Sequence, residues 1–439
     1  MPSLTQLTLF DLQNDSVFPE LTMVTDAIET LSSSSSIEAR GAIFTRIEVV
    51  DFILDLIGYD VSEPLFLRRI LEPSFGAGDF LLPIIERLLA AWRKHGGNAS
   101  SVATELAEAI FGVELHRETF VSTRKAVINR LEKEGISASV ASELADQWLV
   151  QGDFLLEVQK TRFDFVVGNP PYVRQELIPS PLLAEYRRRY KTMYDRADLY
   201  IPFIERSLSL LAEGGTLGFI CADRWMKNRY GGPLREFIAR NFNLKAYVDM
   251  VDTNAFHSEV SAYPAITVIS KTKAGGTRIA HRPEIERTVL SAVAAEIRSE
   301  TLAKDSSVRE MVGVLSGSEP WLLESSDQML LIRRIESQLP SLEQAGCKVG
   351  IGVATGADKA FIGNFESLDV ESDRKLPLVA TRDIQSGEVD WRGQGVINPF
   401  ADDGRLVDLR DYPRLARYLE ARRTDRKSTR LNSSHRIRT

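Results

Sequence analysis

A chain of 439 residues with 44% hydrophobic and 26% charged residues has the composition of a globular protein with a sizeable core, which excludes disorder as its main state. Its length predicts two domains. The formal net charge of −7 argues against a protein that coats nucleic acid nonspecifically. It leaves room for an enzyme that acts on DNA, because a local basic surface suffices to contact phosphates.

The sequence has no basic start followed by an apolar run and no stretch of about 18 apolar residues. We therefore expect a cytoplasmic location and no membrane partner. Cys221, Cys347 and the five histidines lack the spacing of metal ligands or of a disulfide framework. The sequence predicts neither a metal site nor a disulfide.

Hydrophobic periodicity predicts an alternation of strands and helices after a leader. Residues 1–38 are interpreted as a leader and linker that ends in a flexible serine run, Ser32 to Ser36. Helical spacing predicts helices over residues 46–58, 79–94, 118–133, 198–212 and 232–241. Short apolar runs predict strands over residues 69–72, 110–114, 148–150, 163–167, 216–221, 245–250 and 265–270.

This alternation indicates an α/β fold with a doubly wound, mainly parallel sheet, in which ligands bind outside the carboxyl ends of the strands. It fades after about Ala274, and residues 276–319 are interpreted as a connector. A partial, mixed α+β domain is predicted over residues 320–424. Within it, the glycines from Gly350 to Gly363 favour strands and tight loops over a βαβ unit.

The tetrapeptide Asn169-Pro170-Pro171-Tyr172 follows directly on a predicted buried strand. Two prolines restrict the backbone and remove two amide donors, which leaves carbonyl groups free to face a ligand. The Asn169 side-chain oxygen and the Pro170 carbonyl could accept both hydrogens of a planar amino group and concentrate electron density on its nitrogen. Direct methylation of that nitrogen would then need no covalent enzyme intermediate.

A base in a duplex must leave the stack to reach such a loop, and it then needs aromatic platforms. Tyr172 is the first candidate and Phe256 the second, although a core role for Phe256 stays open. A basic stretch downstream of the loop could contact the DNA backbone, or could be a solvated helix face. It comprises Arg187, Arg188, Arg189 and Lys191.

A second group of residues predicts a pocket for a nucleoside cofactor. Gly76 and Gly78 lie between a strand and a helix, where they let the backbone approach a ligand. Glu114 ends the next strand, where a carboxylate can accept both hydroxyls of a ribose. After the third strand, Asp153 can bind an adenine amino group and Phe154 can pack beside the ring. Thr45 either caps the first helix or contacts the cofactor.

In this order, the motifs resemble the gamma-class adenine-specific DNA methyltransferases of restriction-modification systems, of the TaqI type. The resemblance covers about residues 39–271, and the segment around residues 350–363 is similar to the start of that family's target-recognition domain. It implies a Rossmann-like class I methyltransferase domain over residues 39–275 and a partial target-recognition domain over residues 320–424. It also implies S-adenosylmethionine as cofactor, double-stranded DNA as partner and a cognate restriction endonuclease.

Position by position, the resemblance implies two sets of site residues. S-adenosylmethionine would contact Thr45, Glu72, Pro73, Gly76, Gly78, Glu114, Asp153, Phe154 and Asn169. A flipped adenine would contact Asn169, Pro170, Pro171, Tyr172 and Phe256.

Other readings remain open at this point. The same tetrapeptide occurs in enzymes that methylate a release-factor glutamine or a ribosomal RNA guanine, and the chain could also be a DNA-binding specificity subunit or the modification half of a composite restriction enzyme. Residues 425–439 resemble the translation of a sequencing-library adapter. We therefore expect a non-native tail after a protein truncated at its carboxyl end.

Overall fold

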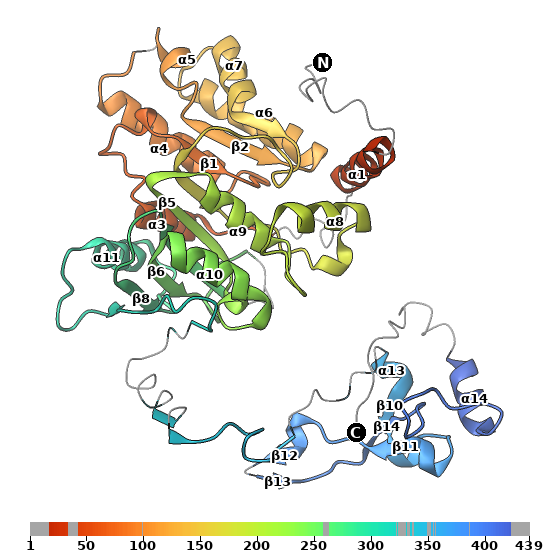
Figure 1. Cartoon of the computed structure of the whole chain (residues 1–439). Helices are drawn as coiled ribbons and strands as arrows, with labels where there is room; N and C mark the ends of the chain where they lie inside the picture. The colour runs from red at the N-terminus through yellow and green to blue at the C-terminus, as the bar shows by residue number, and fades with distance from the viewer. Residues whose placement is uncertain are drawn as a thin grey trace. The chain divides into compact units, whose positions relative to one another are not determined.

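The computed structural model of the chain describes residues 17–33, 43–98, 100–257, 263–321, 323, 331, 334, 335, 338–348, 353, 355, 357–385 and 387–422. The chain divides into two units, Met1–Ile332 and Arg333–Thr439, which are treated separately below (Figure 1). Among the described residues, none of the helices has the length and apolar character needed to cross a membrane.

The first unit is built on a sheet with the strand order β3-β2-β1-β4-β5-β7-β6-β8-β9. Strands β1 to β5 run parallel, β7 is antiparallel to both of its neighbours, β6 and β8 are parallel, and β9 is antiparallel to β8. The strands span Ile70–Glu72 (β1), Ile110–Glu114 (β2), Leu149–Gln151 (β3), Phe163–Gly168 (β4), Leu211–Ala222 (β5), Asn243–Asp249 (β6), Pro264–Ser270 (β7), Thr277–His281 (β8) and Arg309–Met311 (β9).

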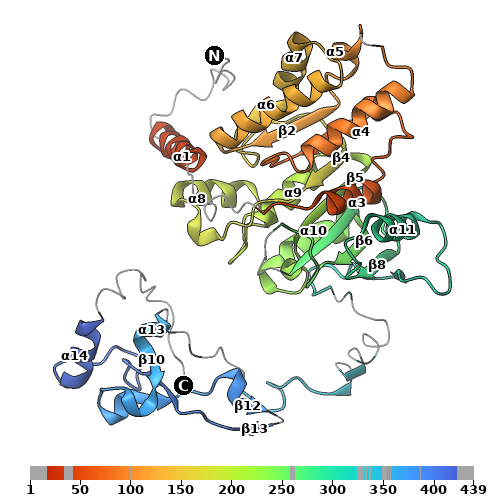
Figure 2. The same cartoon turned by 180° about the vertical axis from the view of Figure 1, so that it is seen from behind.

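Helices cover both faces of this sheet, as Figures 1 and 2 show from opposite sides. Neighbouring strand residues belong to different cores: Ile70 faces one and Leu71 the other. This is the two-residue period of a strand buried on both faces. The first core includes residues of α3 (Ile47–Ile57), α4 (Leu81–Lys94), α5 (Val102–Glu105), α6 (Arg117–Lys133), α7 (Ala138–Trp148) and α11 (Arg287–Arg298). The second includes residues of α1 (Val17–Ser32), α8 (Ser180–Arg189), α9 (Tyr200–Ser209) and α10 (Gly232–Asn241).

The parallel strands place their carboxyl ends at one edge of the sheet. Glu72 and Glu114 are the last residues of β1 and β2, Asp153 follows β3, and Asn169 follows β4. Since β1 lies between β2 and β4, these side chains come from adjacent strands. The predicted Rossmann-like, doubly wound α/β fold is confirmed, and its ligand-binding edge carries the predicted motifs.

The structure shifts three boundaries or assignments that the sequence suggested. Residues 17–32 form α1, which packs against α8, so the leader is not simply a linker. Residues 276–319 are not a connector, because β8, α11 and β9 extend the sheet and its core. The strand predicted over residues 216–221 begins at Leu211, so the helix before it ends at Ser209 rather than at residue 212.

The second unit begins at Arg333 rather than at residue 320, because Trp321 and Leu323 belong to a core of the first unit. It is mixed α+β, with one sheet in the order β10-β14-β11 and a separate β12-β13 pair. Its elements are α13 (Asp358–Phe361), β10 (Ile362–Asn364), β11 (Lys375–Pro377), β12 (Ile384–Gln385), β13 (Glu388–Val389), β14 (Gln394–Ile397) and α14 (Pro413–Ala421). Gly350, Gly352 and Gly356 lie outside the described residues, as does the predicted tail.

Candidate active site

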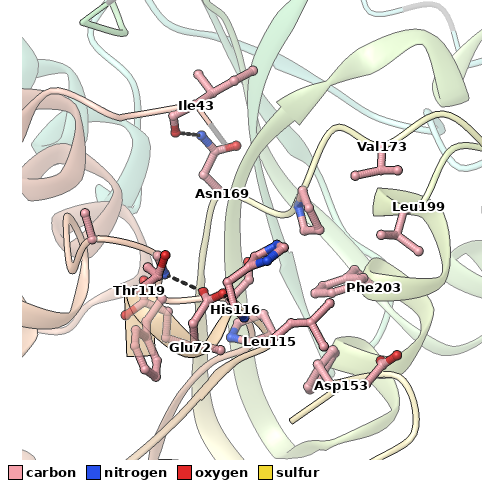
Figure 3. Close-up of a pocket in the computed structure, with 18 of the residues that line it drawn as sticks. Ile43, Glu72, Leu115, His116, Thr119, Asp153, Asn169, Val173, Leu199 and Phe203 are labelled. Carbon is pink, nitrogen blue, oxygen red and sulfur yellow. Dashed lines mark hydrogen bonds between the residues drawn. The ribbon is translucent and has the colours of Figure 1, made fainter. Parts of the chain in front are cut away.

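A cavity of about 280 Å³ opens at the carboxyl edge of the sheet. Nearly all of the predicted cofactor residues line it: Thr45, Glu72, Pro73, Gly76, Glu114, Asp153, Phe154 and Asn169. In Figure 3, Asn169 lies beside Ile43, whereas Asp153 and Phe203 lie toward another end of the group. The structure therefore joins segments that are more than 120 residues apart in the chain.

Asn169 is held in one orientation by its side-chain nitrogen. This nitrogen donates to the Ile43 carbonyl oxygen (3.0 Å) and to the Thr45 hydroxyl (3.3 Å), and the first bond is drawn in Figure 3. The Asn169 side-chain oxygen is buried and has no hydrogen-bond partner among the described residues. A buried acceptor of this kind costs free energy until a donor reaches it. It is ready to accept a hydrogen bond from a ligand.

Thr45 links this asparagine to the segment that carries Phe256. Thr45 and Phe256 face each other in an antiparallel bridge, flanked by a hydrogen bond from the Arg46 nitrogen to the Ala255 oxygen (3.1 Å). Arg46 occupies the N-cap position of α3, without a side-chain cap hydrogen bond, so Thr45 is not the capping residue. The structure thus brings Phe256, 87 positions after Asn169 in the sequence, next to a residue that Asn169 contacts. Phe256 is half-buried against the core.

Tyr172 and the two prolines follow Asn169 in the same loop. The Tyr172 ring is partly exposed and lies 6.3 Å from the Tyr200 ring, measured between centroids. Its hydroxyl is buried, and burial raises the Tyr172 pKa well above the ordinary value. Pro171 lines the cavity, whereas Pro170 is buried and is not among the described lining residues. The Tyr172 ring packs beside Tyr200 and is not among the described residues that line the cavity, so its contact with a target base stays a prediction.

Three carboxylates give the cavity an acidic wall. Glu72 is 2% exposed, and one of its oxygens has no hydrogen-bond partner among the described residues. Burial raises the Glu72 pKa well above its ordinary value, and the charges of Asp79 and Glu114 add to that rise. Burial also raises the pKa of Asp79, which accepts a hydrogen bond from the Thr45 nitrogen (2.9 Å). A cationic ligand would relieve this repulsion.

The glycine turn after β1 connects to Glu114. One oxygen of Glu114 accepts the Gly76 N–H (2.9 Å) and the other accepts the His116 N–H (2.8 Å). These bonds hold the carboxylate at the cavity wall. Gly76 has φ +50° and Gly78 has φ +92°, a backbone region that favours glycine. Gly78 is not among the described residues that line the cavity, so its contact with the cofactor stays a prediction.

Asp153 and Phe154 form the far wall. The Asp153 carboxylate is 7% exposed and accepts hydrogen bonds from the Leu155 N–H (2.9 Å) and the Tyr186 hydroxyl (2.5 Å). The ring of Phe154 lies 5.1 Å from that of Phe203. Both aromatic side chains line the cavity, which gives this end the apolar surface that a purine ring needs.

The basic stretch lies on and just after α8, at the surface. Arg188 and Arg189 pair with Glu185 at 2.7 and 2.6 Å, which lowers the Glu185 pKa to about 2. Arg187 donates to the Gln175 side chain (2.9 Å), and Lys191 is exposed. Arg188 and Arg189 share this one carboxylate, which balances one of the four positive charges, and contact with the DNA backbone stays a prediction.

Some lining residues were not found from the sequence. Asp79 stands at the predicted start of a helix, directly after the glycine turn, and this position could have suggested it. Leu31 of α1, Tyr186 of α8 and Phe203 of α9 also line the cavity. Their sequence positions carry no motif, and only the packing of these helices over the sheet edge brings them there.

Comparison with known proteins gives a consistent result. The family model of the Eco57I restriction-modification methylase matches residues 98–256. The chain is 68% identical over 398 residues to the type II methyltransferase M.PaeR7I of Pseudomonas aeruginosa, covering 90% of this chain and 69% of that protein. It is 53% identical over 387 residues to the type II methyltransferase M.XhoI of Xanthomonas vasicola, covering 87% and 71%.

A solved structure shares the fold at much lower identity. It is that of a nuclease-deletion mutant of the type ISP restriction-modification enzyme LlaGI in complex with a DNA substrate mimic. The TM-score is 0.51 at 16% identity, and the match covers 74% of this chain and 35% of that one.

Proposed function

Because the chain belongs to the type II DNA methyltransferases of restriction-modification systems, we propose that it methylates the exocyclic amino group of an adenine in duplex DNA. The methyl donor is S-adenosylmethionine. The proposal depends most on one observation: the Asn169 side-chain oxygen is buried without a partner at the cavity, while its nitrogen is held by Ile43 and Thr45.

Asn169 would act on the amino group by accepting one of its hydrogens. The Pro170 carbonyl would accept the second, because the loop has the residue pattern of the adenine-methylating family. With both hydrogens engaged, electron density stays on the nitrogen, which becomes the nucleophile. The anchored side chain needs no reorientation during the reaction, and such preorganisation is worth about 3 kcal/mol for a single donor or acceptor.

The fit of S-adenosylmethionine is supported by the acidic wall. This cofactor supplies an electrophilic methyl group on a positively charged sulfur and also carries an ammonium group. The buried, unpartnered oxygen of Glu72 and the two carboxylates near it, Asp79 and Glu114, offer acceptors to a cationic ligand. The bonds that hold Glu114 in place favour its predicted role toward the ribose hydroxyls, and Asp153 would accept from the adenine amino group.

The Asn169 side chain lies at the cavity, and a base that is still stacked in the duplex cannot enter a cavity. The target base would therefore have to leave the duplex to reach this loop. Tyr172 and Phe256 are the proposed platforms. Each has a partly exposed ring, and each neighbours Asn169, Tyr172 in sequence and Phe256 through Thr45. The described part of the second unit is proposed to belong to a target-recognition domain, and a cognate endonuclease is the proposed partner of the system.

Labelled S-adenosylmethionine, offered with duplex DNA, ribosomal RNA and a release factor in parallel, tests the substrate class. We expect label on DNA alone, recovered as N6-methyladenine after digestion and mass spectrometry. Asn169→Ala should lower this transfer by at least about 10²-fold, with cofactor affinity within about threefold by calorimetry. Asn241→Ala, at an exposed position on α10, is the matched control. Label on RNA or on the release factor but not on DNA would contradict the proposal.

A further inference from the structure

Helix α8 reaches the far wall of the cavity through one buried side chain. Tyr186 is 3% exposed and lines the cavity, and its hydroxyl donates to the Asp153 carboxylate at 2.5 Å. It stands beside the basic stretch in the sequence, but its side chain points inward. Neither the predicted cofactor set nor the proposed mechanism uses it.

The surrounding contacts hold the loop after β3 in place. Tyr190, the residue directly after α8, donates to the Leu155 carbonyl oxygen (2.5 Å) and accepts from Arg206 of α9 (2.9 Å). The Arg206 guanidinium lies 5.0 Å from the centre of the Phe154 ring and also donates to the Glu157 carbonyl oxygen. Side chains from α8, from the residue after it and from α9 thus hold the loop after β3 in place. Among these side chains, only Tyr186 contacts the carboxylate of Asp153.

This hydrogen bond has a chemical consequence for Asp153. Burial raises the Asp153 pKa, whereas the bonds from Tyr186 and Leu155 and the charges of Arg206 and Arg189 oppose that rise. An ionised carboxylate only accepts hydrogen bonds, while a protonated one can donate. With Tyr186 and Leu155 donating to it, the group is an acceptor suited to an amino group and unsuited to a carbonyl oxygen.

We propose that Tyr186 is a positioning residue for cofactor selectivity: its hydroxyl holds the Asp153 carboxylate as an acceptor, so that the cavity takes a 6-aminopurine nucleoside and disfavours a 6-oxopurine one. The inference rests on the proposed function, because it assumes that Asp153 faces the purine of the cofactor. It predicts selectivity at the base and leaves the reacting methyl group untouched.

Two product-like ligands test this directly: S-adenosylhomocysteine and its deaminated counterpart S-inosylhomocysteine, which differ at the 6-position of the purine. Calorimetry on the full chain gives the ratio of their dissociation constants. We expect the wild-type protein to prefer the adenosyl ligand by at least about tenfold. Tyr186→Phe should reduce this preference to about twofold or less, because the unsupported carboxyl can protonate and donate to the oxo group.

Tyr190→Phe is the matched control, since it removes a hydroxyl, four residues after Tyr186, that donates to the same loop. It should weaken both ligands alike and keep their ratio. In an Asp153→Asn background, Tyr186→Phe should leave the ratio unchanged, because the two residues act as a pair. A wild-type ratio in Tyr186→Phe, or equal affinities in the wild-type protein, would overturn the inference. Transfer to DNA is measured separately, so failure of the proposed function is distinguishable.

Discussion

Glu72 and the two carboxyl groups near it, Asp79 and Glu114, show how buried acidic groups can suit a cationic ligand. An acid with one unpartnered oxygen and two acids nearby is a poor arrangement for a core, because each charge raises the cost of the next. The same arrangement is a good one for a ligand with two positive charges. A bound cation would offset the electrostatic cost of ionising these buried carboxyl groups.

This gives a prediction for pH. A cation lowers the Glu72 pKa that burial has raised, so binding favours the ionised group and the affinity for S-adenosylmethionine should fall as pH falls through that pKa. One coupled proton changes the dissociation constant by about tenfold per pH unit at most. Calorimetry between about pH 5.5 and 7.5, below the ordinary pKa of an α-amino group, would show it.

Glu72→Gln is the comparison for this titration. The amide keeps the shape of the side chain but cannot ionise, so the variant should bind more weakly at neutral pH and depend less on pH. Asp79 still titrates in this variant, which leaves a residual slope. If wild type and variant showed the same slope, the role of Glu72 would be refuted.

At the scale of elements, α1 is a helix that the sequence did not predict and that packs against the second core beside the cavity. One side of it packs into a core through Val24, Ala27, Ile28 and Leu31, and Leu31 also lines the cavity. An ion pair between Glu29 and Arg117 (2.9 Å) adds a second attachment, although an exposed pair of this kind contributes little. The helix therefore acts on the site by apolar packing.

A charged residue on the buried side of α1 tests whether the packing of this helix contributes to cofactor binding. Ala27 is 7% exposed, so Ala27→Arg should lift α1 from the core and raise the dissociation constant for S-adenosylmethionine several-fold, because Leu31 leaves the cavity wall. Met23→Arg, at a side chain that is 54% exposed on the same helix, should leave affinity unchanged. Equal affinities of the two variants would show that α1 plays no part in binding.

The difference between α1 and α3 explains how far the sequence could predict these elements. Helix α3 buries residues such as Val49, Val50 and Ile53, and Gly58 in the left-handed region is its C-cap. Both the helical spacing of its apolar residues and the glycine that ends it are therefore visible in the sequence. In contrast, α1 leads into a serine run and α8 carries three consecutive arginines. The apolar residues of α1 do recur at helical spacing, Val24, Ile28 and Leu31 among them, but the serine run that follows favours a linker, and tertiary contacts decide where both helices pack.

The same reasoning holds for the site. The residues that follow strands, Glu72, Glu114, Asp153 and Asn169, could be placed together from the sequence, because parallel strands bring their carboxyl ends to one edge. Leu31, Tyr186 and Phe203 could not, since they come from helices that cross this edge at angles that no local pattern encodes. The antiparallel bridge between Thr45 and Phe256 is likewise a tertiary contact.

At the scale of the whole molecule, the described residues that line the cavity all belong to the first unit. They lie between Leu31 and Phe203 in the sequence. The second unit has a core of its own, made of Ala360, Phe361, Leu368, Val370, Ile397, Leu415 and Leu419. Because the described residues that form the cavity and the nine-stranded sheet all precede residue 332, cofactor binding and DNA recognition should be separable.

A fragment of residues 1–332 tests this separation. It keeps both cores of the first unit, including Trp321 and Leu323, so it should fold and bind S-adenosylmethionine with a dissociation constant within about twofold of the full chain. Without the proposed recognition unit it should lose specific DNA contacts, and methylation of DNA should fall on the order of 10³-fold. Calorimetry and transfer of labelled methyl groups measure the two effects on one preparation. Loss of cofactor binding would show that the second unit supports the cavity, whereas full DNA methylation would place target recognition within the first.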